Sequence, residues 1–149
     1  MAVILTAICV VVLLIVLVLR NRRSRARHEI EQYSITPEGL RALFASNQEV
    51  LLFDVRLPLD LLASSVIIPG AKRIAPKEIL ENPSLIPKDK DSVIYCTCPS
   101  DETSRAVLHR VLAQGFLRTK FLKGGLEAWR ARVFPVERYQ EAFHLDTGT

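Results

Sequence analysis

The chain has 149 residues, 49% of them hydrophobic, and its 20 basic against 16 acidic side chains give a formal charge of +4. This length accommodates about one ordinary domain with an appendage. Five arginines cluster at residues 20–27, and without them 15 basic and 16 acidic side chains remain, a charge of about −1. The positive charge therefore belongs to one short segment and does not indicate a surface for nucleic acid.

The chain begins with nineteen residues that carry no charge and only one polar side chain, Thr6. As a helix they would rise about 28 Å, close to the roughly 30 Å hydrocarbon core of a bilayer. A secretory signal peptide would have a basic residue before the run and small residues after it, whereas arginines follow here. We therefore expect a retained transmembrane anchor at residues 1–19 and a basic juxtamembrane linker at residues 20–33. The positive-inside rule places the rest of the chain in the cytoplasm.

Short apolar strands and short helices alternate after this segment. Helices are expected from Pro37, where Thr36 can cap the first turn, and at residues 58–63, 76–80, 103–114 and 126–132. Strands are expected within residues 49–55, around 72–74, and at 93–96 and 119–122. This alternation predicts an α/β fold with a mainly parallel sheet. In such sheets ligands bind outside the carboxyl ends of the strands.

Two cysteines, Cys96 and Cys98, occupy the loop between the expected strand 93–96 and the helix that follows it. A loop that opens a helix directs backbone N–H groups and a positive dipole end at whatever lies there, which stabilises a thiolate. A zinc site would need two further ligands, and the three histidines have no ligand-like spacing. The chain's three cysteines also do not make a disulfide framework. The pattern therefore predicts a reactive thiol.

Over residues 34–136 the chain resembles a rhodanese-like domain, because five motifs occur in the family's order. They are Asp54-Val55-Arg56-x-Pro58, Ile68-Pro69-Gly70-Ala71, Tyr95-Cys96 with Thr103-Ser104, Gly124-Gly125-Leu126-Glu127-Ala128-Trp129, and Pro135-Val136. The resemblance implies a three-layer α/β fold with a central, mainly parallel sheet, and leaves residues 137–149 as a C-terminal tail. It implies a sulfurtransferase whose loop cysteine takes sulfur from thiosulfate, a polysulfide or a protein persulfide. The resulting persulfide passes its sulfur to a thiol acceptor, and no metal or organic cofactor is required.

Either loop cysteine fits the family's spacing. Counting forward through the strand gives Cys96 as the nucleophile, whereas counting back from Gly115 gives Cys98. We favour Cys96, because Pro99 removes the amide that follows Cys98, and expect the other thiol to be able to resolve a persulfide. The expected substrate-binding residues are Pro99, Ser100, Asp101, Glu102, Thr103, Ser104 and Arg105. Asp54 and Arg56 are expected to have supporting roles, Asp54 by pairing with backbone N–H groups or with Arg56, and Arg56 as a salt-bridge or surface residue.

Three departures from the family pattern concern the activity. The loop is two residues longer than usual if Cys96 is the nucleophile, and Ser65-Val66-Ile67 lacks the family's histidine. Asp101 and Glu102 stand where a basic residue is common, and we expect both to point outward at the helix N-terminus. Even with this orientation, we expect thiosulfate to be a poorer donor than a polysulfide or a protein persulfide.

Two alternative functions are compared with the enzyme. The first is a rhodanese module that has lost turnover and binds a partner at the membrane. The second is a phosphatase or arsenate reductase, which would need an arginine six residues after its cysteine to hold an oxyanion. Glu102 and Ser104 occupy those positions, so the residues argue against this second alternative.

Overall fold

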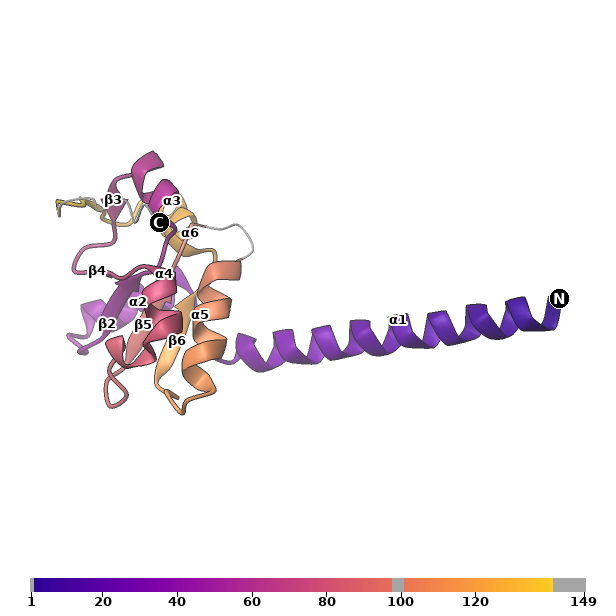
Figure 1. The fold of residues 1–149 in the computed structure, drawn as a ribbon. Helices are drawn as coiled ribbons and strands as arrows, with labels where there is room; N and C mark the ends of the chain where they lie inside the picture. Colours follow the sequence, from indigo (N-terminus) through magenta and orange to yellow (C-terminus); the bar gives the residue numbers. More distant parts are fainter. Residues whose placement is uncertain (1, 98–100, 141–149) are drawn as a thin grey trace, which may run out of the picture. The chain divides into compact units, whose positions relative to one another are not determined.

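The computed structural model describes residues 2–97 and 101–140, and Figure 1 shows their helices and strands. The chain divides into two compact units, Met1–Gln32 and Tyr33–Thr149. The first unit contains the single helix α1 (Ala2–Glu31). The helix continues through the segment expected to be a linker, because residues 20–31 contain neither proline nor glycine and are rich in arginine, a good helix former.

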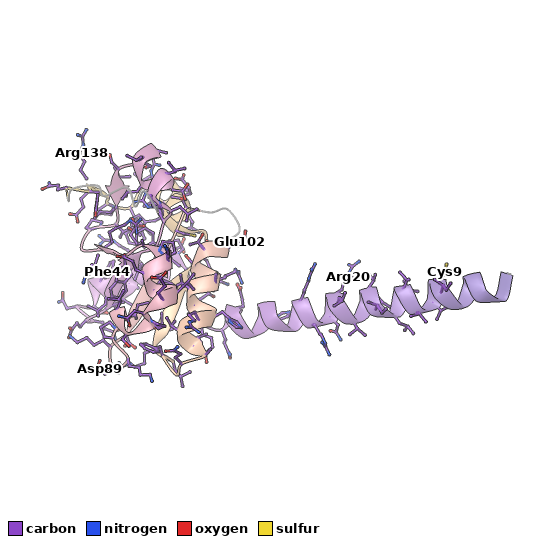
Figure 2. All side chains as sticks on the ribbon, in the orientation of Figure 1. Cys9, Arg20, Phe44, Asp89, Glu102 and Arg138 are labelled. Carbon is purple, nitrogen blue, oxygen red and sulfur yellow. The ribbon has the colours of Figure 1, made fainter. Side chains whose placement is uncertain are left out.

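The apolar side chains of α1 between Ile8 and Leu19 are exposed in the chain as it stands. Figure 2 shows side chains projecting from this helix, with Cys9 and Arg20 labelled. Within the parts of the chain that the structure describes, we find no helix with both the length and the apolar character needed to cross a membrane.

The second unit is built on a five-stranded sheet in the order β1-β6-β5-β2-β4. Its strands are β1 (Ser34–Ile35), β2 (Leu51–Asp54), β4 (Lys72–Arg73), β5 (Ser92–Tyr95) and β6 (Thr119–Leu122). All four neighbouring pairs are parallel. The two central strands are buried along nearly their whole length, as expected for a parallel sheet covered on both faces. The expected α/β class with a central parallel sheet is confirmed.

Helices cover both faces of this sheet. They are α2 (Pro37–Ala45), α3 (Pro58–Ala63), α4 (Pro76–Glu81), α5 (Glu102–Leu112) and α6 (Gly125–Ala131), with a short 3₁₀ helix η1 (Pro83–Leu85). Helices α2 and α6 pack on one face, and α5, with α4 beside it, packs on the other. Thr36 caps α2 as expected, because its hydroxyl accepts a hydrogen bond from the Gly39 N–H at 3.1 Å.

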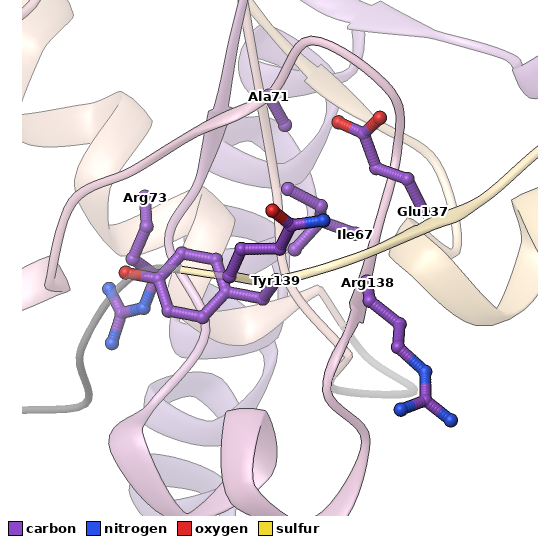
Figure 3. Close-up of a pocket in the computed structure, with 7 residues that line it drawn as sticks. Ile67, Ala71, Arg73, Glu137, Arg138 and Tyr139 are labelled. Carbon is purple, nitrogen blue, oxygen red and sulfur yellow. The ribbon is translucent and has the colours of Figure 1, made fainter.

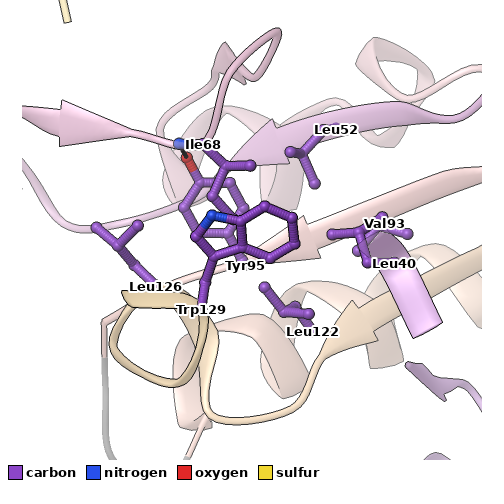
Figure 4. Packing of buried hydrophobic residues seen from close by; sticks show 8 residues of the cluster. All are labelled: Leu40, Leu52, Ile68, Val93, Tyr95, Leu122, Leu126 and Trp129. Atoms are coloured by element: carbon purple, nitrogen blue, oxygen red, sulfur yellow. Dashed lines mark hydrogen bonds between the residues drawn. The ribbon is translucent and has the colours of Figure 1, made fainter. Parts of the chain in front are cut away.

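The apolar cluster between the sheet and the α2–α6 layer holds the domain together (Figure 4). Alternate residues of the central strands point into it, and α2 and α6 close it from above. Its members are Leu40, Leu52, Ile68, Val93, Tyr95, Leu122, Leu126 and Trp129. Burying one such side chain stabilises the fold by roughly 1.5–3 kcal/mol. The cluster therefore holds β5, the strand that leads to the cysteine loop, in place.

Three strands of two residues each are absent from the sequence-based expectations. Strand β1 (Ser34–Ile35) lies where only a helix start was expected. Strands β3 (Val66–Ile67) and β7 (Glu137–Arg138) pair antiparallel in a separate ribbon. Part of the expected C-terminal tail is thus paired, because Ile67 and Glu137 lie opposite one another.

Candidate functional site

Strand β5 delivers Cys96 to the carboxyl edge of the sheet. The cysteine follows the strand directly, lies between the ends of β2 and β6, and is fully buried. The start of α6 closes over it, since the Leu126 N–H donates to the Cys96 carbonyl at 2.9 Å. Gly125 comes so close that a Cβ there would lie 1.9 Å from the same carbonyl oxygen. The Gly-Gly turn of α6 therefore sets the backbone position of Cys96.

The far end of the cysteine loop is tied to the same turn. Asp101, just before α5, has left-handed backbone angles (φ 54°, ψ 24°) and is only 6% exposed. Its Oδ2 accepts a hydrogen bond from the Gly124 N–H at 2.9 Å. The expectation that Asp101 points outward is therefore wrong. Its carboxylate turns inward, because it accepts a hydrogen bond from the Gly124 amide at the start of α6. Glu102 is exposed, as expected. Cys98, Pro99 and Ser100 lie outside the described residues.

The first turn of α5 presents Ser104 inward. Ser104 is fully buried, and its hydroxyl has no hydrogen-bond partner among the residues that the structure describes. Thr103 and Arg105 beside it are half-buried. The Arg105 guanidinium lies 4.6 Å from the centre of the Phe121 ring, a cation–π contact that holds positive charge near the loop.

Asp54 and Arg56 form a fully buried pair beneath the ends of the strands. The Arg56 Nη2 donates to Asp54 Oδ2 at 2.6 Å, and the Arg56 Nε lies within 3.0 Å of both carboxylate oxygens. The remaining guanidinium donors reach the carbonyls of Ser64 and Val66. The expected pairing is confirmed, and it fastens the end of β2 to the segment that enters β3.

Tyr95, the neighbour of Cys96, extends this network into β5. Its hydroxyl donates to Asp54 Oδ2 and accepts from the Ile68 N–H, both at 3.2 Å. Burial, and next the Asp54 carboxylate, raise the pKa of Tyr95 and keep the phenol neutral. In the sequence Tyr95 is only part of the Tyr95-Cys96 motif, with no role of its own predicted. An aromatic side chain with a polar tip, placed in a buried strand beside a buried aspartate, could have identified it.

These contacts bring several expected site residues to one edge of the sheet. Cys96, Asp101 and Ser104 surround the beginning and end of the loop, and Asp54 and Arg56 lie below it. Among the described residues, no group of three or more histidine, cysteine or acidic side chains is placed to hold a metal ion. A buried cysteine at the start of the loop, with a buried hydroxyl and an arginine in the helical turn that ends it, suits nucleophilic chemistry by a thiol.

Comparisons with known proteins agree with this geometry. The family model of the rhodanese-like domain matches residues 36–132. A sulfurtransferase of Allochromatium vinosum is 34% identical over 102 residues, which cover 68% of this chain and 92% of the relative. A probable adenylyltransferase/sulfurtransferase MoeZ of Mycobacterium tuberculosis is 33% identical over 105 residues, which cover 68% of this chain but 26% of that protein. The crystal structure of a full-length protein from Lactobacillus plantarum shares the fold, with a TM-score of 0.66 at 20% identity over 80% of this chain and 98% of the other.

Proposed function

Because the chain belongs to the rhodanese-like domain family, we propose that it is a sulfurtransferase that carries sulfur on a cysteine of the loop between β5 and α5. One observation carries the proposal above all. Cys96 stands at the carboxyl end of the central strand of a parallel sheet, directly before a loop that opens a helix. This is the position at which open α/β sheets bind ligands and at which backbone amides favour an anion.

The reaction consists of two exchanges at sulfur. The cysteine thiolate attacks the outer sulfur of the donor, forming a new S–S bond as the donor's own S–S bond breaks. The bonding pair leaves with sulfite from thiosulfate, or with a thiolate from a polysulfide or protein persulfide. An acceptor thiolate then attacks the outer sulfur of the persulfide, and the cysteine leaves as a thiolate. Electrons balance within these steps, so neither a metal nor an organic cofactor takes part.

Ser104 supports this chemistry from the first turn of α5. Its buried hydroxyl is available to donate a hydrogen bond to an anionic sulfur held in the loop. Arg105 adds positive charge nearby, while Asp101 is engaged by Gly124. A polysulfide or protein persulfide remains our preferred donor, because a carboxylate lies buried at the end of the loop.

Intact-protein mass spectrometry tests the proposal. The full chain is incubated with thiosulfate or a polysulfide, and a persulfide adds the mass of one sulfur, about 32 Da. We expect this adduct in the native protein and its loss in the Cys96→Ser, Cys98→Ser double variant. The single variants identify the nucleophile. A native chain that gains no adduct from any donor supports the alternative, a rhodanese module that binds a partner without turnover.

We further propose that residues 1–19 anchor the protein in a membrane with the domain on the cytoplasmic side. The charge-free run, the arginines behind it and the exposed apolar side chains from Ile8 to Leu19 support this proposal. Extraction of cell membranes at alkaline pH should leave the protein in the membrane fraction. Release into the supernatant would contradict the anchor. Labelling of the loop cysteines in intact cells by an impermeant thiol reagent would contradict the cytoplasmic placement.

A further inference from the structure

A pocket of about 340 Å³ lies beside the end of β4. Its walls come from the end of β3, the turn before β4 and residues 137–140 (Figure 3). Neither Cys96 nor any residue of α5 is among the described residues that line it. The residues to which the sulfur transfer is assigned are therefore not the ones that give this pocket its chemistry.

Arg73 is the charged residue that gives this pocket its chemistry. Its Nε and Nη1 atoms are buried and have no hydrogen-bond partner in the part of the chain that the structure describes. A guanidinium stays charged at every physiological pH, so buried donors without an acceptor are costly. The carboxylate nearest in the sheet register is Asp54, which lies opposite Arg73 and is already engaged by Arg56 and Tyr95. Within residues 2–97 and 101–140, the Arg73 Nε and Nη1 donors thus have no acceptor.

The other walls add an apolar surface and no competing carboxylate at Arg73. Ile67 and Ala71 supply apolar contacts, and Tyr139 lines the same pocket (Figure 3). Glu137 lines the opposite part of the pocket, where its carboxylate accepts a hydrogen bond from the Gly70 N–H at 3.1 Å. The lining as a whole is more polar than apolar, so the pocket joins a cationic end at Arg73 to a small apolar patch.

We propose that this pocket binds a small anion, a carboxylate or sulfur oxyanion, through the Arg73 guanidinium. Its volume lies at the lower end of the roughly 300–1,000 Å³ range of ligand pockets, which fits a compact molecule with a short apolar body. The anionic group would accept hydrogen bonds from Nε and Nη1, and the apolar body would lie against Ile67 and the Tyr139 ring. The proposal does not depend on the proposed sulfurtransferase activity.

Side-chain NMR of the full chain, purified in mild detergent and labelled with ¹⁵N-arginine, tests this site directly. The Arg73 Nε–H resonance is assigned by its loss in Arg73→Lys and followed during titration with benzoate, thiosulfate or neutral benzamide. We expect a saturable shift with benzoate, with thiosulfate or with both, and none with benzamide. The anion that shifts the resonance shows whether the ligand is a carboxylate or a sulfur oxyanion. No saturable shift with either anion at about 10 mM, weaker than ordinary small-molecule affinity, would overturn the proposal, as would equal binding of benzamide.

Variants at Arg73 and Arg138 distinguish binding by Arg73 from a general effect of positive charge. Arg138 also lines the pocket, but it is exposed to water, so Arg138→Met should weaken binding of the anion much less than the Arg73 variants do. Arg73→Met should weaken binding at least tenfold by isothermal titration calorimetry. Arg73→Lys preserves the charge if the methionine variant does not fold, and it should weaken binding less. Equal losses in Arg138→Met and the Arg73 variants would contradict a site built on Arg73.

Discussion

Gly125 is the residue at which α6 and the cysteine loop leave no space for a side chain. It has a positive φ of 52°, and an added Cβ would lie 1.9 Å from the Cys96 carbonyl oxygen. In Gly125→Ala the backbone strain and the clash together should lower the free energy of unfolding by about 3 kcal/mol. The sulfur adduct should be lost with it, because the Cys96 backbone must move. Urea denaturation and mass spectrometry measure the two effects.

Gly70 provides the matched control for this substitution. It also has a positive φ, 79°, but nothing lies within 4 Å of an added Cβ. Gly70→Ala should therefore cost only the backbone term, about 1–2 kcal/mol, and should still form the adduct. Equal effects at the two glycines would show that the close approach to Cys96 has no consequence.

The Asp54–Arg56 pair should be the most sensitive ion pair among those described. Both side chains are fully buried, so Arg56→Met leaves the Asp54 carboxylate buried without its cation and should cost about 3–5 kcal/mol. The exposed pair of Arg118 with Asp91 is the comparison, and Arg118→Met should cost less than about 1 kcal/mol. Chemical denaturation measures both, and similar values would refute the importance of burial here.

Tyr95 should make the free energy of unfolding of the domain depend on pH in the alkaline range. Burial and Asp54 raise the pKa of Tyr95 above its ordinary value of 10.0. Above that pH the unfolded chain releases the phenol proton while the folded chain retains it. The unfolded state then binds fewer protons, so the free energy of unfolding should fall by about 1.4 kcal/mol per pH unit.

Tyr95→Phe removes this titration. At neutral pH the variant should be less stable by about 1–3 kcal/mol, because the Ile68 N–H and the Asp54 carboxylate lose a buried partner. Above pH 10.0, where the phenol of the unfolded chain ionises, the difference from the native chain should shrink. Urea denaturation at a series of pH values measures it, and a difference that stays constant would argue against a buried neutral phenol.

At the scale of elements, local sequence patterns predicted those elements whose signals are local. The expected strand 119–122 and helix 58–63 have the same bounds in the structure, since an apolar run and an initial proline mark them. The two-residue strands β1, β3 and β7 were missed. Two residues show no periodicity, and each strand exists because a distant segment pairs with it.

The features of the site fall into the same two groups, those marked by local sequence motifs and those that depend on a distant partner. The cysteine loop, the Gly-Gly turn and the Asp54–Arg56 pair follow from motifs that are contiguous in sequence. The inward turn of Asp101 could not be predicted, because its partner is the Gly124 amide, 23 residues away. Arg73 was likewise unremarkable in sequence, since only the pairing of β7 with β3 brings residues 137–140 around it.

Trp129 links α6 to the ribbon of β3 and β7. Its ring packs edge-on against Phe44 and Phe134, and its indole N–H donates to the Pro135 carbonyl at 2.8 Å. Trp129→Phe removes the indole donor and should loosen the chain just before β7. We expect faster hydrogen exchange of the Tyr139 amide, which bonds to the Ser65 carbonyl at 2.8 Å. The Leu126 amide, bonded to Cys96, is the internal control, and equal acceleration of both would indicate general destabilisation instead.

At the scale of the whole molecule, the two compact units predict that the second folds without the first. The boundary falls between Gln32 and Tyr33. Hydrogen bonds define it sharply, because the Phe121 N–H donates to the Tyr33 carbonyl and the Lys123 N–H to the Ile35 carbonyl, each at 2.9 Å. These bonds hold the edge strand β1 against β6, so the domain begins at Tyr33.

Two fragments that differ by three residues test this boundary. The fragment 33–149 retains β1 and should match the full chain in urea denaturation to within about 0.5 kcal/mol, the usual additivity of independent parts. The fragment 36–149 lacks β1, leaves the Phe121 and Lys123 amides at an open sheet edge, and loses Ile35, which packs on the core cluster. Since each lost hydrogen bond costs about 0.5–1.5 kcal/mol and burial of Ile35 is also lost, this fragment should be less stable by about 3 kcal/mol. Equal stability of the two fragments would mean that β1 contributes nothing to the sheet, and instability of both would mean that the helical unit is needed for the domain to fold.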